Sequence, residues 1–89
     1  MLSAADFKLR LDLIFSLAQQ NGLQEVEVSS EDLHKRVGGY PGRDHRMPLC
    51  CQVMTQYFTE KAGDHIVETP PSGQGATLRI RYVLPRPAQ

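Results

Sequence analysis

The side chains best suited to hold an anion gather in one short segment near the middle of the chain. Arg43 and Arg46 stand just before a predicted helix with His45 between them, and Lys35 and Arg36 come shortly before the segment. Arginines at the start of a helix add to its positive end and can meet a phosphate or the edge of a guanine. The structural alternative is a loop whose arginines pair with acidic side chains of the same segment and of the first helix. Both interpretations stay open, because loops presented by a scaffold often carry function.

Cysteine and histidine do not form a metal-binding pattern. Cys50 and Cys51 are adjacent, so they lack the C-x₂-C spacing of structural zinc sites, and neighbouring cysteines rarely form a disulfide. Consecutive residues of a helix point about 100° apart, so only one of the two thiols can lie on the inner side of a helix. We therefore expect Cys50 in the core and Cys51 partly exposed. We expect neither a metal site with His34 and His45 nor a cofactor.

Catalytic motifs are equally weak in this chain. The glycine-rich residues 38–42 do not match the phosphate-binding loop or the dinucleotide-binding pattern. Cys51 could pair with His45 or His65 as nucleophile and base, but nothing in their spacing favours this. A chain of 89 residues also leaves little room for a cleft. We therefore expect that the protein is not an enzyme.

Charge is balanced over the whole chain but unevenly placed along it. Ten basic and ten acidic side chains give a net charge of zero, so no overall attraction draws the chain to nucleic acid. Residues 1–32 carry two basic and six acidic side chains, a net of −4, whereas residues 33–58 carry four basic and one acidic, a net of +3. A basic middle can still form one local surface that faces an anion.

Length and composition predict one small domain in a reducing compartment. A chain of 89 residues suits a single domain, which we place over residues 1–84 with a flexible tail over residues 85–89. The two cysteines cannot supply a disulfide framework, which favours a cytoplasmic location. The chain start does not resemble a signal peptide, and no apolar run approaches the roughly 20 residues that cross a bilayer. We therefore expect no membrane contact.

Hydrophobic periodicity and turn residues predict three helices, one short strand and a final two-stranded hairpin. The predicted elements are helices over residues 4–20, about 30–37 and about 47–59, and strands over residues 25–28, 65–69 and 76–84. The third helix should bury Cys50, Val53, Met54, Tyr57 and Phe58, and the last strand Leu78, Ile80, Tyr82 and Leu84. The first helix carries a wide apolar side that other elements should largely cover: Phe7, Leu9, Leu11, Leu13, Ile14, Leu17 and Ala18.

The order helix, short strand, helix, helix and hairpin resembles the winged helix-turn-helix superfamily. The resemblance covers residues 4–84 and rests on element order, without a sequence fingerprint. It implies an α+β winged-helix fold in which residues 47–59 enter the major groove of DNA and residues 70–76 form the tip of the wing. Two features depart from the superfamily. Residues 38–46 make a longer connection than the usual turn of about 3–4 residues, and the third helix contains no charged residue.

The resemblance also implies which residues would contact DNA. The outward residues of the third helix would read base edges, since Gln can read adenine and Thr can meet the thymine methyl group. The central loop, the second helix and the wing would hold phosphates. The predicted DNA-contacting residues are Lys35, Arg36, Arg43, His45, Arg46, Gln52, Thr55, Gln56, Ser72, Gln74, Arg79 and Arg81. The alternative for the wing is an ordinary polar hairpin, because outer strand residues are commonly charged to prevent edge pairing.

Three functions fit these features. The first is a small winged-helix protein that binds double-stranded DNA as a regulator or targeting module, and a homodimer would raise its specificity. The second is a winged helix that binds another protein through the loop of residues 40–47, as an adaptor or as a phage- or plasmid-borne inhibitor of a nucleic-acid-processing machine. Tyr40, Pro41, Met47 and Pro48 would form its contact patch. The third is an accessory subunit without a ligand of its own.

Overall fold

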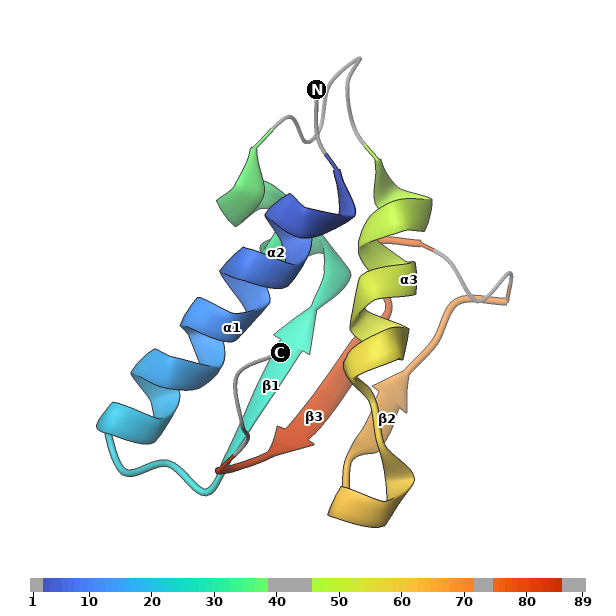
Figure 1. Ribbon diagram of the computed structural model, residues 1–89. Coiled ribbons are helices and arrows are strands. Elements are labelled where there is room, and N and C mark those ends of the chain that lie inside the picture. Colours follow the sequence, from blue (N-terminus) through green and yellow to red (C-terminus); the bar gives the residue numbers. More distant parts are fainter. Residues whose placement is uncertain (1–2, 39–45, 72–74, 86–89) are drawn as a thin grey trace.

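The computed structural model describes residues 3–38, 46–71 and 75–85, which form an α+β fold of three helices and a three-stranded antiparallel sheet (Figure 1). The predicted α+β class is therefore confirmed. The elements in chain order are α1 (Ala4–Gln20), β1 (Glu25–Ser29), α2 (Ser30–Val37), α3 (Met47–Tyr57), the 3₁₀ turn η1 (Glu60–Ala62), β2 (His65–Glu68) and β3 (Arg79–Val83).

The helices begin where their capping residues predict. At the start of α1 the Asp6 carboxylate accepts hydrogen bonds from the Ser3 backbone N–H at 2.8 Å and from its hydroxyl at 3.2 Å. At the start of α2 the Ser29 hydroxyl accepts from the Asp32 backbone N–H at 3.1 Å, which satisfies one of the free donors of the first turn. Gly38 ends α2 with φ of +114°, a conformation that glycine adopts without strain.

The helix α3 ends at Tyr57, two residues before its predicted end. The cause is Asp64, whose buried carboxylate accepts from the Thr59 backbone N–H at 2.9 Å and from the Val83 backbone N–H at 2.8 Å. The backbone N–H of Thr59 therefore makes its hydrogen bond outside the helix, and the backbone of Phe58 is extended. One side chain thus fastens the segment after α3 to the sheet.

The sheet has the strand order β1-β3-β2, with β3 in the centre. Register pairs Val28 with Ile80 and Glu27 with Arg81, so one face of the sheet is apolar and the other charged. The helices α1 and α3 lie over the apolar face (Figure 1). The predicted alternation along the last strand is confirmed, although β3 is shorter than predicted because residues before Arg79 bond to the loop and to α2.

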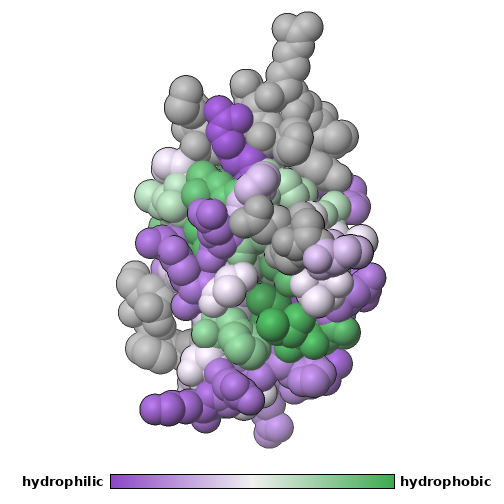
Figure 2. Space-filling model, turned by 90° about the vertical axis from the view of Figure 1, so that its right-hand side faces the viewer, coloured by the Kyte–Doolittle hydropathy of each residue, from purple (hydrophilic) through white to green (hydrophobic). Residues whose placement is uncertain are grey.

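The strand β2 is an edge strand, and all four of its residues are exposed. Figure 2 looks at this side of the molecule, where hydrophobic side chains form a small group bordered by hydrophilic ones. Ile66 and Val67 are the large apolar residues of β2 that remain exposed. The pairing with β3 is irregular between Ile66 and Glu68, as expected where a bulge twists an edge strand.

The core lies between α1, α3 and the apolar face of the sheet. The ring of Tyr82 is fully buried, meets the ring of Phe15 edge-on at 5.0 Å and donates its hydroxyl proton to the Met54 carbonyl at 2.8 Å. The predicted inner residues of α3 and β3 are buried, except for Phe58, which is half-buried. Because Tyr82 is fully buried and its hydroxyl group is hydrogen-bonded, this side chain fixes how β3 packs on α3.

The prediction that other elements largely cover the apolar side of α1 holds for only part of that side. Leu9, Leu13 and Leu17 are exposed, whereas Phe15, which was not among the predicted stripe residues, is buried. The physical reason is geometric: the core reaches only one side of the helix, and these three leucines point away from it. Ile14 lies between the two sides and is half-buried.

Candidate nucleic-acid interface

The outward side of α3 is uncharged and able to form hydrogen bonds. Pro48, Gln52 and Gln56 are exposed one turn apart, and Thr55 is exposed beside them. The Thr55 hydroxyl donates to the Cys51 carbonyl at 2.8 Å, which leaves its methyl group as the part available to a ligand. The three side chains predicted to point outward do so. Each glutamine amide offers an acceptor oxygen and two donors, which can match the major-groove edge of adenine.

A buried histidine of α2 fixes the start of α3. His34 is fully buried and meets the ring of Phe7 edge-on at 5.1 Å. Its Nε2 accepts a hydrogen bond from the Arg46 backbone N–H at 2.7 Å, which requires that this nitrogen carry no proton. The Arg46 carbonyl accepts from the Cys50 backbone N–H at 2.9 Å, as the first bond of the helix. Arg46 is thereby held at the N-terminal end of α3.

The base of the hairpin loop is fastened to α2 and α3 through Gly75. The Ser30 hydroxyl donates to the Gly75 carbonyl, and the Gly75 N–H donates to Cys51 Sγ at 3.3 Å. A Cβ at Gly75 would lie 3.2 Å from the ring of Pro70, so glycine permits this close approach. These contacts leave Cys51 only 1% exposed, and the prediction of a partly exposed thiol is wrong. Gly75 therefore has a fixed position beside α3.

Arg79 and Arg81 lie on the open face of the sheet, where glutamates of β1 compensate their charge. Arg79 Nε lies 3.5 Å from Glu27 Oε2, and Arg81 Nη2 lies 3.5 Å from Glu27 Oε1. Arg81 Nε also lies 3.8 Å from Glu25 Oε1. Exposed pairs of this kind contribute only about 0–1 kcal/mol each, but together they leave this face with little net charge. Both arginines stay predicted phosphate ligands, and phosphate would compete with the glutamates for them.

Lys35 and Arg36 lie on different sides of α2. Lys35 Nζ pairs with Glu31 Oε1 at 3.1 Å, one turn earlier in the helix. Arg36 lines a hollow next to Ile14 of α1 and Val26 of β1. That side of α2 is not the one whose His34 contacts the start of α3. The structure therefore does not gather the two predicted phosphate ligands of α2 at one place.

Similarity to known proteins does not assign the chain to a family. No family model, curated protein or solved structure matches it. Its function has to be inferred from which side chains the fold exposes and which charges it compensates.

Arg43, His45, Ser72 and Gln74 lie outside the described residues. Within residues 3–38, 46–71 and 75–85, no group of three His, Cys, Asp or Glu side chains could hold a metal ion. Among the helices of these same segments, none combines the length and the apolar character needed to cross a bilayer.

The thiol of Cys50 stays protonated at neutral pH. Its pKa is raised to about 12, mainly by burial and to a smaller extent by the neighbouring Cys51.

Two residues that position the candidate interface were not predicted from the sequence. His34 sits on the inner side of α2 beside Leu33, and its place in that apolar stripe was the available signal. Asp64 follows Gly63, which has φ of +95°, and an aspartate at a turn commonly accepts bonds from nearby backbone N–H groups. Both side chains act on the ends of α3, one at its start and the other just after its end.

Proposed function

We propose that this protein is a winged-helix module that binds double-stranded DNA, as a regulator or as the targeting part of a larger system. The helix α3 would lie in the major groove, with Gln52 and Gln56 reading base edges and the Thr55 methyl group meeting a thymine. The observation that carries the proposal is the outward side of α3, which presents amides at one-turn spacing and no charge.

The strand order supports the same proposal. The hairpin of β2 and β3 follows α3 directly in the chain, and its second strand, β3, lies between β2 and β1 (Figure 1). In winged helices such a hairpin touches the DNA backbone next to the recognition helix. Here Gly75, at the start of the chain's return to β3, bonds to Cys51 of α3, so α3 and this part of the hairpin would approach DNA together.

The described charges favour specific binding over general affinity for DNA. Glutamates pair with Arg79, Arg81 and Lys35, so these three predicted phosphate ligands would each have to exchange a glutamate for a phosphate. Each phosphate contact contributes about −0.9 to the slope of log K against log salt concentration. We therefore expect a shallow slope of about −2 to −3, which corresponds to two or three phosphates.

Selection from a randomised duplex library tests the proposal. The selected duplex should bind the wild-type chain more tightly than a scrambled duplex of the same composition. The double variant Gln52→Ala/Gln56→Ala should lose this preference by roughly 30-fold or more, because each good amide–base pair is worth about 1–3 kcal/mol and two of them about 2–6 kcal/mol. Gln20→Ala, which removes an exposed glutamine at the end of α1, is the matched control and should bind like wild type. No binding to any duplex at low salt would contradict the proposal.

Binding to another protein is the second candidate function, and the exposed leucines of α1 favour it. Of the contact patch expected around residues 40–47, Met47 is buried in the core, whereas Pro48 is exposed. Tyr40 and Pro41 lie outside the described residues. If the chain binds no DNA, a protein partner that wild type captures and Leu13→Lys does not would establish this second function.

A further inference from the structure

The two edges of the sheet differ in regularity. The strand order β1-β3-β2 leaves one edge at β2 and the other at β1 (Figure 1). The pairing of β2 with β3 is irregular between Ile66 and Glu68, and such bulges commonly protect an edge from further pairing. The residues of β1 pair with β3 in unbroken register. The β1 edge therefore keeps the regular geometry that another strand can extend.

Alternate residues of β1 direct their backbone groups away from β3. Gln24 and Ser30, which flank β1, form backbone hydrogen bonds with the residues that flank β3, at 2.9 and 2.8 Å. Hydrogen-bonded and non-bonded residues alternate along an antiparallel strand, so the even-numbered residues of β1 bond to β3. The backbone N–H and carbonyl groups of Glu25 and Glu27 therefore point to the free edge. Both residues are exposed, and no other described segment bonds to these groups.

An apolar hollow of about 220 Å³ adjoins this free edge. Ile14 and Leu17 of α1 and Val26 of β1 form apolar walls, and Glu27 lies at the strand side of the hollow. Residues directly opposite each other on neighbouring strands point to the same face of a sheet. On a strand added to β1, a residue opposite Val26 would therefore point toward the helices. The hollow can receive the side chain of that residue.

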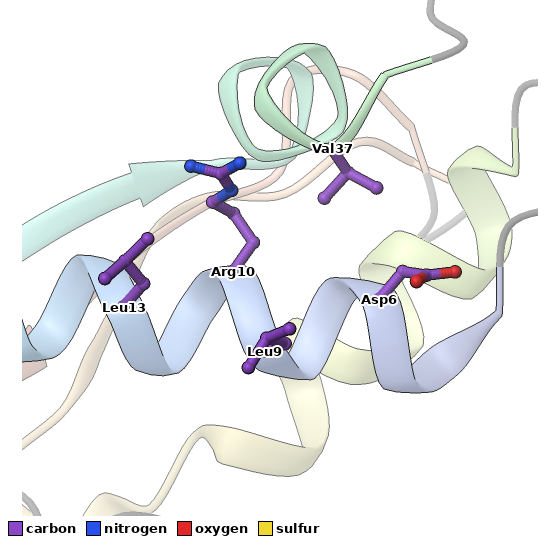
Figure 3. A pocket seen from close by; sticks show the side chains of 5 residues that line it. All are labelled: Asp6, Leu9, Arg10, Leu13 and Val37. Carbon is purple, nitrogen blue, oxygen red and sulfur yellow. The ribbon is translucent and has the colours of Figure 1, made fainter.

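A second hollow, of about 210 Å³, lies between α1 and α2, and no strand residue lines it (Figure 3). Its lining residues are Asp6, Leu9, Arg10, Leu13 and Val37. In Figure 3, Val37 points from α2 toward α1, and Arg10 extends from α1 toward α2. Leu13 and Leu17 are 44% and 51% exposed and lie one turn apart, but of the two only Leu17 lines the hollow at the sheet edge.

The side chains of β1 determine which residues an added strand can carry. Glu25 and Glu27 lie on the open face of the sheet, where their partners in β3 are Arg79 and Arg81. Opposite charges on neighbouring strands are favourable, and like charges directly opposite each other are unfavourable. The same glutamates would meet a strand at the free edge. The alternation of basic and apolar residues that pairs with β1 in β3 therefore also suits that edge.

We propose that the β1 edge binds an extended segment of another protein, which adds an antiparallel strand and alternates apolar with basic residues. Its basic residues would lie opposite Glu25 and Glu27, and the apolar residue between them would enter the hollow beside Leu17. The orientation follows the rest of the sheet, whose pairs are antiparallel. A second copy of β1 suits the edge poorly, because the aligned glutamates of two copies would repel each other.

This contact is small and separate from the candidate nucleic-acid interface. It consists of the backbone groups of two residues and one apolar side chain, so we expect a Kd on the order of 100 µM for a short peptide. Gln52 and Gln56 of α3 do not line the hollow. The proposal therefore goes beyond DNA binding and stands without it.

A synthetic peptide tests the proposal on the full chain. The peptide has five residues and blocked ends, with leucine at its odd and arginine at its even positions. Amide chemical shifts followed up to about 1 mM peptide should give the expected Kd. Leu17→Lys fills the hollow with a charged side chain and should weaken binding at least ten-fold. Leu13→Lys adds the same charge one turn away and should bind like wild type, and circular dichroism should show that both variants fold.

Hydrogen exchange and peptide methylation test whether the peptide adds a strand. In the free chain the amides of Glu25 and Glu27 should exchange faster than those of Val26 and Val28. Bound peptide should slow the two glutamate amides about ten-fold at about 90% occupancy, because only the bound state protects them. N-methylation of either arginine removes an N–H that faces β1 and should abolish binding. N-methylation of the central leucine, whose N–H faces away from β1, should leave binding unchanged.

Several results would overturn the proposal. One is the absence of binding at about 1 mM peptide, ten times the expected Kd. Another is equal weakening by Leu17→Lys and Leu13→Lys, and a third is equal binding of the peptides methylated at arginine and at the central leucine. A peptide with glutamate in place of arginine should bind at least ten-fold more weakly, and equal binding would contradict the selection of basic residues by Glu25 and Glu27.

Discussion

The helices α1 and α3 bury one side against the same core, and their opposite sides differ in chemistry. The outer side of α1 presents Leu9, Leu13 and Leu17, whereas that of α3 presents Gln52 and Gln56. Exposed leucines favour an apolar partner, because burying them removes nonpolar area from water. Exposed amides favour a partner with hydrogen-bonding edges, such as the bases of DNA. The comparison distinguishes two exposed surfaces of different chemistry on one small domain.

Replacing leucine by alanine on the two sides of α1 should give the largest difference in the free energy of unfolding. Leu11→Ala removes a fully buried side chain and should lower the free energy of unfolding by about 2–5 kcal/mol. Leu13→Ala should change it by less than about 0.5 kcal/mol, as for an exposed position. Urea titration measures both values. Equal losses at the two positions would show that Leu13 is buried within the monomer.

Removing the side chain that starts α3 should have the next largest effect. His34→Ala leaves the backbone N–H of Arg46 without its acceptor and should cost about 1–3 kcal/mol in the free energy of unfolding. Lys35→Ala is the control, because its side chain is exposed and its ion pair with Glu31 contributes little. An unfolding curve of His34→Ala that overlays that of Lys35→Ala would show that α3 does not need this bond.

Substitutions on the outer side of α3 should change DNA binding but not the free energy of unfolding. Gln52→Ala and Gln56→Ala should change the free energy of unfolding by less than about 0.5 kcal/mol, since both side chains are exposed. Each should weaken binding to a selected duplex by about 1–3 kcal/mol. Thermal unfolding and fluorescence anisotropy measure the two effects on the same samples. A loss of stability without a loss of binding would place these glutamines outside the interface.

The smallest effect should appear only at high pH. Burial raises the pKa of Cys50 from 9.0 to about 12, and burial together with the Asp12 carboxylate raises that of Tyr57 from 10.0 to about 12. The unfolded chain therefore releases these protons first as pH rises. The free energy of unfolding should be independent of these two groups below pH 9 and should fall between pH 9 and about 12. In Cys50→Ala/Tyr57→Phe the fall should be shallower, and an equal slope would contradict this account.

Local chemistry made most of the elements predictable. The residues that cap a helix lie next to its end in the sequence, so their effect can be predicted from neighbouring residues. Examples are Ser3 with Asp6 at the start of α1, Ser29 before α2 and Gly38 after α2. Alternation along β3 likewise predicted that Ile80 and Tyr82 point inward. The outward position of Gln52 and Gln56 follows from the same reasoning, because helical periodicity places them opposite the inner stripe.

Contacts between distant segments could not be predicted in this way. Asp64 reaches the backbone of Val83, and Gly75 covers Cys51, so the end of α3 and the burial of that thiol depend on residues far along the chain. Glu27 and Arg81 are equally far apart in the sequence. Their pairing compensates the charge of Arg81, which the sequence alone predicted to be available for a phosphate.

By itself the sequence determined where each helix and strand lies, apart from the end of α3 and the bounds of β3, and which side of α3 faces outward, because both depend on periods of a few residues. Only the tertiary structure decided that Leu9, Leu13 and Leu17 remain exposed and that Arg79 is paired with Glu27. The physical reason is that burial and charge compensation depend on what packs against a surface. A stripe of leucines has the same period whether another helix covers it or water does.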